Sequence, residues 1–326
     1  MSRALNAMGS DQSVRKKRDY LFDRVGLYAF IIIILIIVSS VILALPYSNT
    51  YIGDYGADDI YLKSFVYLAV ISTAVLIIGL FYNVMIWMEG SVSGADSAAP
   101  PAKKFFLSLR KLLKAVFSRD FGKILSSFIL EVIFLRKFWG ISKVRWIVHG
   151  LILFGFMGIF ILDIVTTIAL EIFDSRSFIE PTGWGKLWIR DFGFDLLGLM
   201  IMVGLAGAIV RRFVIRPKQL VTGAEDVVSV LLLLIVVFSG FVLEGIGMAS
   251  GIPGHESPEV YSFVGSIFSA ISPAVSVDGY AQLWFLHALV SLALIIYIPF
   301  SKLFHIFSAP LAMQLNDIIK RGEISP

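Results

Sequence analysis

Residues 280–310 of this chain read YAQLWFLHALVSLALIIYIPFSKLFHIFSAP. The part from 280 to 303 is almost free of charge. It is long enough to cross a membrane as a helix, because a hydrocarbon core of about 30 Å takes about 20 residues at about 1.5 Å each. His287 lies inside this stretch and His305 follows its end. The sequence therefore predicts a membrane-spanning helix with one imidazole within it and another where it leaves the bilayer.

Five other apolar stretches have spanning length, near residues 25–46, 62–88, 146–170, 187–210 and 227–249. The composition agrees with them, since 57% of the residues are hydrophobic, only 16% are charged and the mean hydropathy is +0.84. That leaves too little polar surface to coat a soluble domain of this size. We predict an all-α fold, a polytopic membrane helix bundle with six transmembrane helices in a lipid bilayer.

The chain contains no cysteine. This excludes disulfides, a cysteine-held zinc, a covalently attached c-type haem and any iron–sulfur cluster ligated by cysteines of this chain. The net charge of +4 and a pI near 9.1 do not indicate a nucleic-acid partner. The basic residues lie between the apolar stretches, where they report membrane orientation instead.

Orientation follows from lysine and arginine, which are retained on the cytoplasmic side. The segment up to residue 24 has 6 of them, residues 89–145 have 11, residues 211–226 have 4 and the residues after 300 have 3. On the other side, residues 47–61 and 250–279 have none and residues 171–186 have two. Both termini are therefore expected in the cytoplasm, with the chain in the plasma membrane of a prokaryote.

The chain divides into five expected segments. Residues 1–61 are a basic tail with an extra anchor helix, 62–88 the second transmembrane helix, 89–145 a cytoplasmic loop, 146–303 a four-helix bundle that binds haem, and 304–326 a cytoplasmic C-terminal tail. Within the loop, apolar side chains recur at helical spacing among lysines and arginines between residues 103 and 116. This predicts an amphipathic helix, either on an anionic membrane surface or as a platform for a partner. Residues 121–139 are short and charged, which favours an interfacial position.

Three of the four histidines fall in or at the ends of predicted spans. The span that begins at 146 enters from the cytoplasm and the last span returns to it, so His149 and His305 are expected at the same inner level. Two antiparallel helices that each offer an imidazole at one height can hold a metal porphyrin between them. Apolar neighbours suit a flat macrocycle and glycines would give it room: Leu151, Phe154, Phe156, Phe304 and Phe307, with Gly150, Gly155 and Gly158.

His287 and His305 are 18 residues apart, which is five helical turns. On a continuous helix they would share one face, about 27 Å apart along the axis, a spacing that suits two stacked redox centres. Pro299 between them is expected to kink the helix. An isolated transmembrane histidine also commonly serves only to hydrogen-bond a neighbouring helix, so the residues alone leave both interpretations open.

The chain resembles the nitrate reductase gamma-subunit superfamily of membrane cytochromes b, in particular the branch of heterodisulfide reductase and dissimilatory sulfite reductase-linked membrane subunits. The resemblance lies in residues 145–156 (RWIVHGLILFGF), 282–289 (QLWFLHAL) and 297–310 (YIPFSKLFHIFSAP). It implies an inner haem b held by His149 and His305. It also implies that His287 holds an outer haem, but residues 157–160 lack the second histidine that this would need. A second haem therefore requires another group, such as Met248 or His255.

The same resemblance implies a quinone-reactive subunit that passes electrons between a membrane quinone and a cytoplasmic iron–sulfur subunit. Carboxylates inside a membrane are costly unless they are paired or hydrated, and a quinol needs acceptors for its protons. Asp163, Glu244 and His287 are candidates for this role, although ordinary interfacial solvation, with Asp195 or Asp191 neutralising Arg190, would explain the charges as well. A polytopic solute transporter and a haem-free membrane anchor remain alternatives, because small residues and intramembrane acids occur in those classes too.

Overall fold

The computed structural model describes residues 60–89, 99–118, 121–169, 173, 175–217 and 223–320 of the 326. Five candidate membrane spans lie in this part of the chain, at 67–88, 143–166, 185–215, 224–249 and 277–300. The last five of the six predicted spans are confirmed as helices of spanning length. The stretch near 25–46 falls outside the described residues, so the sixth span stays a prediction.

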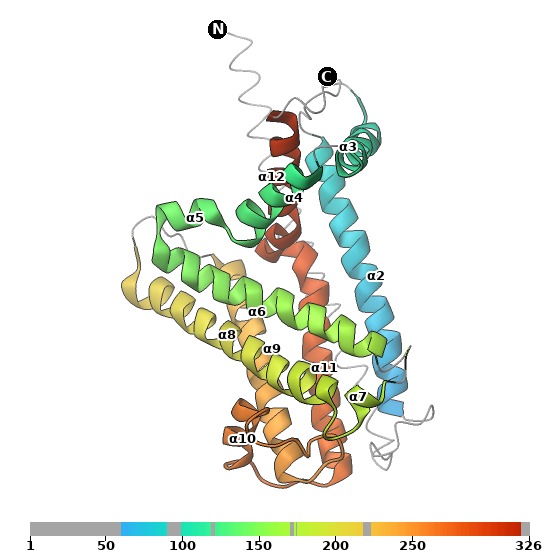
Figure 1. The fold of residues 1–326 in the computed structure, drawn as a ribbon, viewed down its shortest axis with the longest axis vertical. Helices are drawn as coiled ribbons and strands as arrows, with labels where there is room; N and C mark the ends of the chain where they lie inside the picture. Colours follow the sequence, from blue (N-terminus) through green and yellow to red (C-terminus); the bar gives the residue numbers. More distant parts are fainter. Residues whose placement is uncertain are drawn as a thin grey trace.

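The spanning helices form two groups that cross obliquely (Figure 1). One group pairs α6 (Lys143–Thr167) with α8 (Phe192–Ile209), which continues through the π-helical turns η4 (Gly185–Asp191) and η5 (Val210–Ile215). The other contains α2 (Ile60–Met88), α9 (Ala224–Ala249) and α11 (Val277–Tyr297). Two apolar cores hold the bundle together, one joining α2 and α9 to α11, and one joining α8 and α9 to α11.

Small residues let α6 and α8 pack closely. A Cβ atom on Gly155 would lie 2.5 Å from Cγ1 of Ile201, and one on Gly158 would lie 2.7 Å from Cδ2 of Leu197. From the other side, a Cβ on Gly204 would lie 2.7 Å from Cγ1 of Ile152. These contacts correct one expectation, because Gly155 and Gly158 give room to the neighbouring helix rather than to a macrocycle.

The last span does not continue to His305 as one helix. After α11 ends at Tyr297, two short 3-10 turns follow, η6 (Ile298–Phe300) and η7 (Lys302–Phe304), and a new helix, α12 (His305–Lys320), begins. Proline has no N–H to donate and clashes with the preceding turn, and the Nδ2 atom of Asn83 in α2 donates to the carbonyl oxygen of Pro299 at 2.7 Å. The break is sharper than the expected kink, so the predicted shared face of His287 and His305 is wrong.

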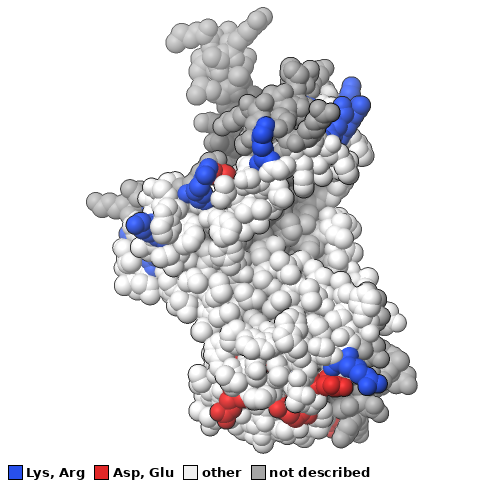
Figure 2. Space-filling model, in the orientation of Figure 1, with Lys and Arg blue, Asp and Glu red and all other residues white. Residues whose placement is uncertain are grey.

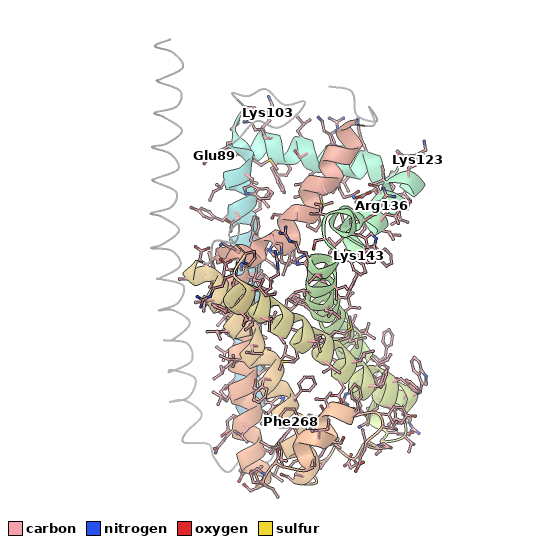
Figure 3. All side chains as sticks on the ribbon, turned by 90° about the vertical axis from the view of Figure 1, so that its left-hand side faces the viewer. Glu89, Lys103, Lys123, Arg136, Lys143 and Phe268 are labelled. Atoms are coloured by element: carbon pink, nitrogen blue, oxygen red, sulfur yellow. The ribbon has the colours of Figure 1, made fainter. Side chains whose placement is uncertain are left out.

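Shorter helices cover the two ends of the bundle. We call the end that carries α3 (Pro101–Val116), α4 (Phe121–Ser127), η2 (Phe128–Ile133), α5 (Arg136–Ile141) and α12 the His305 end, and the end that carries α7 (Arg176–Ile179) and α10 (Phe263–Ser269) the α10 end. Lys103 and Lys123 lie at the first and Phe268 at the second (Figure 3). Figure 2 shows lysines and arginines gathered towards the His305 end, mostly acidic residues at the α10 end, and an uncharged band between them.

The helices outside the spans agree in part with expectation. Residues 101–116 form the amphipathic helix that was predicted, with Phe106 and Leu113 exposed while Lys104 is buried. In residues 121–141, α4 runs directly into η2, and Leu135, whose φ of 51° interrupts the helix, separates η2 from α5. This stretch is not among the candidate spans. Residues 305–320, expected as a tail, form α12, which packs against α3, α4 and η2.

Candidate haem site

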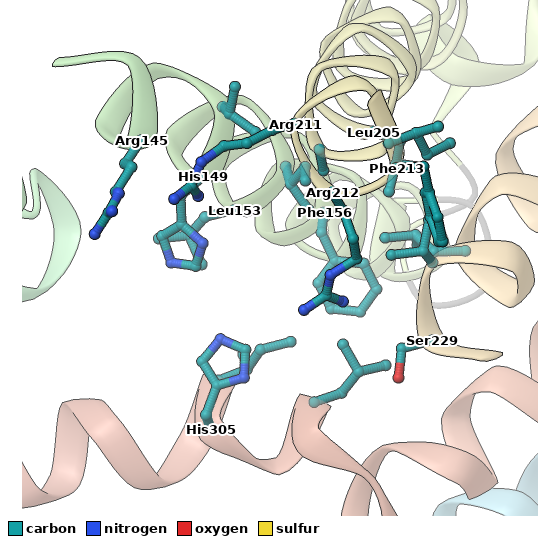
Figure 4. Close-up of a pocket in the computed structure, with 18 residues that line it drawn as sticks. Arg145, His149, Leu153, Phe156, Leu205, Arg211, Arg212, Phe213, Ser229 and His305 are labelled. Atoms are coloured by element: carbon teal, nitrogen blue, oxygen red, sulfur yellow. The ribbon is translucent and has the colours of Figure 1, made fainter. Parts of the chain in front are cut away.

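The two histidines predicted to act together are brought face to face. His149 lies in the second turn of α6, a helix whose start is capped by Ser142, and His305 is the first residue of α12. Their ring centroids are 6.0 Å apart and their planes are inclined by 30°. Figure 4 shows the rings opposed across a cavity. The break after Pro299 places His305 in this position, because α12 leaves α11 in a new direction.

The ring of His305 is oriented by its own backbone. Its Nδ1 atom lies 2.6 Å from the carbonyl oxygen of Lys302. A carbonyl can only accept, so Nδ1 carries the hydrogen and Nε2 is the nitrogen left for another partner. Metal-binding histidines are commonly held in this way through the nitrogen that does not bind the metal.

A network of charges fixes the segment that carries this carbonyl. Lys302 Nζ lies 2.9 Å from Oδ2 of Asp226, and Arg212 Nη2 lies 3.3 Å from the same oxygen. Asp226 also accepts the N–H of Gly223 at 3.0 Å and so closes the first turn of α9. One carboxylate therefore ties together the end of η5, the start of α9 and the segment before His305.

The cavity between the histidines has a volume of about 410 Å³ and opens to the surface. Its walls are mostly aliphatic and aromatic, from α6, α8, α9 and the segment around His305: Val148, Ile152, Leu153, Phe156, Leu205, Ala208, Ile209, Phe213, Val230, Leu233, Leu303 and Ile306. Three arginines, Arg145, Arg211 and Arg212, line it as well. This volume and this mixture of apolar wall and few polar groups are typical of a cofactor pocket.

The surroundings of the histidines differ from expectation in two ways. Of the predicted aromatic neighbours, Phe156 lines the cavity, whereas Phe154 packs on Phe134 and Phe304 packs on Trp87. From the sequence, the three arginines indicate only the orientation of the chain in the membrane. Their role at the cavity could have been predicted from their position at the same helix ends as His149, because a porphyrin carries carboxylates that arginine can bind.

The geometry fits a porphyrin held by two imidazoles. Metal–imidazole bonds are about 2 Å long, so two opposed rings bound to one metal ion have centroids about 6 Å apart, as His149 and His305 do. The apolar walls match the macrocycle, and the arginines match its carboxylates. The donor set, two imidazoles, is one that would hold the iron of a haem b.

His287 lies in a different environment from His149 and His305. Its Nδ1 atom is 2.8 Å from the hydroxyl of Ser239 on α9, and a Cβ placed on Gly240 would lie 3.9 Å from its Nε2. His255, suggested as a ligand that could complete a second haem, uses its Nε2 atom to contact the hydroxyl of Tyr280 at 2.7 Å. The structure therefore does not bring His255 and His287 together in the way that it joins the other pair.

The predicted acids are also separated. Asp163 is exposed on α6 and forms no hydrogen bond or ion pair with another described residue. Glu244 on α9 instead meets Asp195 on α8, with the hydroxyl of Ser262 beside it. The alternative in which Asp195 neutralises Arg190 is not what the structure shows, since its Oδ2 atom accepts the backbone N–H of Val264 at 2.6 Å.

A buried polar cluster lies near them at the α10 end. Lys186 is fully buried and its Nζ is 3.1 Å from Oδ2 of Asp191, while Ser257 bonds both of them. Burial, with the charges of Lys186 and Arg190, lowers the pKa of the nearby His255 to about 4. The imidazole is therefore neutral at physiological pH, and its contact with Tyr280 needs no charge.

Comparison with known proteins identifies similar chains. The profile of the family described as "Nitrate reductase gamma subunit" matches residues 145–320, which is more than half of the chain. A subunit of dihydromethanophenazine:CoB–CoM heterodisulfide reductase is 27% identical in Methanosarcina barkeri and 28% identical in Methanosarcina mazei, with 82% of this chain and 97% or 98% of the relative covered. "EtfAB:quinone oxidoreductase" of Syntrophomonas wolfei is 24% identical over 52% of this chain and 25% of its own length. No solved structure matches.

Proposed function

Because this chain belongs to the nitrate reductase gamma subunit family, we propose that it is the membrane cytochrome b subunit of a respiratory oxidoreductase, nearest in kind to the membrane subunits of heterodisulfide reductases. The observation that carries the proposal is the pair of opposed imidazoles, 6.0 Å apart, in an apolar cavity lined by arginines. The names of the relatives support a redox complex in the membrane. A solute transporter or a passive anchor has no need of this arrangement.

We propose one haem b, bound between His149 and His305. The haem supplies a reversible one-electron couple at its iron. His149 and His305 would hold the iron, the carbonyl of Lys302 holds the ring of His305 through Nδ1, and Arg145 and Arg211 would bind the carboxylates of the macrocycle. The phenylalanine and leucine side chains of the cavity exclude water from its faces.

We propose that the His305 end faces the cytoplasm, since lysine and arginine gather there and are retained on that side. The haem pocket opens near this end, so its electrons can pass to a partner on the cytoplasmic face. The partner is an iron–sulfur subunit, because this chain has no cysteine with which to hold clusters of its own. Figures 2 and 3 show basic side chains on the helices that cap this end, the surface that such a partner would meet.

We propose that a membrane quinone exchanges electrons with the haem from the lipid phase at the level of His287. Leu283 and Leu286 beside it are exposed, so a lipid-soluble ring can approach the helix there. Asp226 at the haem end and Glu244 are 18 residues apart on α9, about 27 Å along its axis. His287 contacts Ser239, which lies between these two residues on α9, so His287 lies between the haem pocket and the buried carboxyls. A quinol oxidised there releases two electrons, which a bound haem would accept singly, and two protons, for which the carboxyl pair of Glu244 with Asp195, and Asp163, are the candidate acceptors.

The test is reduction of the protein by a quinol. The purified chain in nanodiscs, mixed with 2,3-dimethyl-1,4-naphthoquinol under argon, should show the absorption bands of reduced haem b. His287→Gln, which keeps a hydrogen bond to Ser239, should slow this reduction at least tenfold while dithionite still reduces the haem fully. A colourless protein, or a coloured one that dithionite reduces and no quinol does, would reject the proposal.

A further inference from the structure

Two carboxyl groups meet inside the bundle near the α10 end. Asp195 on α8 is 1% exposed, and the carboxyl group of Glu244 on α9 lies beside it. Gly265 of α10 closes the site, because a Cβ at this position would lie 2.5 Å from Cδ of Glu244. Asp195 is buried and Glu244 is half-buried, so the two acids meet where little water reaches them.

The two oxygens of Asp195 differ in their partners. Oδ2 accepts the backbone N–H of Val264 at 2.6 Å. Oδ1 is buried and has no donor among the described residues. A buried acceptor without a donor is costly, and such oxygens in native proteins usually have a partner.

The missing donor is supplied if Glu244 carries a proton. A carboxylate only accepts, so two ionised acids cannot bond to one another, whereas a protonated Glu244 donates its O–H to Asp195. The backbone N–H of Val264 in α10 stabilises negative charge on Asp195, which makes Asp195 the ionised member. The hydroxyl of Ser262 lies beside Glu244 and can donate to its remaining carboxyl oxygen.

We infer that Asp195 and Glu244 together form a binding site for one proton, held on Glu244 in the resting protein. The surrounding charges agree with a singly protonated pair. Asp191 on η4 acts on both acids as a further negative charge, and its partner Lys186 is already used by Asp191 and Ser257. Ionising both members would place a third negative charge in a poorly solvated interior, where like charges repel strongly.

In the proposed function, which this part of the inference presupposes, the pair can accept a proton that quinol releases and pass it towards the α10 end. Asp195 takes up that proton, so the pair becomes neutral, and loses it again towards the loop that carries Ser262. The electron that accompanied the proton leaves separately through the haem. The pair thus separates the path of the proton from that of the electron.

The proton can be measured without haem chemistry. Infrared spectra of the full chain in nanodiscs at pH 7, recorded in H₂O and in D₂O, should contain the carbonyl stretch of a buried carboxylic acid. Glu244→Gln should remove this band and keep the fold, since its amide still donates to Asp195. Asp195→Asn should remove it as well, because an amide donor lets Glu244 ionise. Glu225→Gln, which removes an exposed acid at the other end of α9, should leave the band intact.

Retention of the band in Glu244→Gln, or its loss in Glu225→Gln, would overturn the inference. A second measurement, the unfolding temperature, distinguishes loss of the bound proton from misfolding of the variant. Glu244→Gln should unfold at nearly the wild-type temperature, while Glu244→Leu, which leaves Asp195 without a donor, should unfold at a clearly lower one; equal temperatures would contradict the hydrogen bond. His149→Ala should retain the band, so failure of the haem proposal would not be mistaken for failure of this one.

Discussion

The Nζ atom of Lys302 lies 2.9 Å from Oδ2 of Asp226 and so joins the start of α9 to the segment whose carbonyl holds the ring of His305. This is a contact over 76 residues of sequence. It connects an ion pair to the proposed haem ligand, because the side chain of Lys302 reaches Asp226 while its backbone orients the imidazole.

Asp226→Asn should loosen this connection. The amide cannot replace the charge that holds Lys302 and Arg212, so His305 is expected to bind less firmly. Partners of metal-ligating histidines typically contribute a factor of about 10–100 in affinity, and we expect haem affinity to fall by about tenfold, with part of the haem becoming high-spin. Glu225→Gln, the neighbouring exposed acid, is the control. Titration of the protein with haemin, followed by absorption and electron paramagnetic resonance, measures both effects, and identical behaviour of the two variants would contradict the role of Asp226.

Arg211→Gln should weaken haem retention without changing the ligands. Arg211 lines the cavity, whereas Arg216, five residues later, does not, so Arg216→Gln serves as the matched loss of charge. We expect the first variant to lose haem several times faster to an acceptor such as apomyoglobin, with an unchanged low-spin spectrum. Equal rates of loss in both variants would show that the arginines act only through net charge.

Gly155→Ala should destabilise the packing of α6 on α8. The added methyl group would lie 2.5 Å from Ile201 and 2.7 Å from the carbonyl oxygen of Leu197, and overpacking of this kind costs about 1–3 kcal/mol. Gly122→Ala in α4, where a Cβ meets no atom within 4 Å, should be neutral or slightly stabilising, since alanine favours helix by about 1 kcal/mol over glycine. Thermal unfolding in one detergent compares the two, and a Gly155→Ala protein as stable as wild type would refute the close contact.

The stability of the α10 end should depend on His255 below neutral pH. Its folded pKa is about 4, against 6.5 for an ordinary histidine, so the unfolded chain binds more protons between these values. Stability should fall as the pH decreases from about 6.5 to 4, by at most about 3 kcal/mol, and the loss from this group should be complete below that. His255→Gln, which can still bond Tyr280, should flatten this part of the profile. Unfolding temperatures at pH 7, 5.5 and 4.5 test it, and an unchanged slope in the variant would contradict the assignment.

The sequence predicts the spans well because length and hydropathy are properties of single segments. The described helices α2, α6, α8, α9 and α11 lie within a few residues of their expected positions. The pairing of His149 with His305 was also predictable, since helix direction alone brings both residues to one level. These features need no knowledge of which faces of the helices meet.

The remaining features depend on contacts between distant residues. The break before His305 needs Asn83 of α2 to bond the carbonyl of Pro299, and no local pattern reveals that partner. The meeting of Asp195 with Glu244 depends on the rotation of α8 and α9 about their axes, so the two acids look unrelated in the sequence. The sequence does not indicate whether Gly155 faces a cofactor or a neighbouring helix, because glycine allows a close approach of either.

Whether His149 and His305 hold a single haem is decided by the ratio of haem to protein, measured by the pyridine haemochrome method on purified chains of verified size and helicity. We expect one non-covalent haem b per wild-type chain, none in His149→Ala and none in His305→Ala, and the wild-type ratio in His287→Gln. An unchanged ratio in either of the first two variants would show that these imidazoles do not bind the iron.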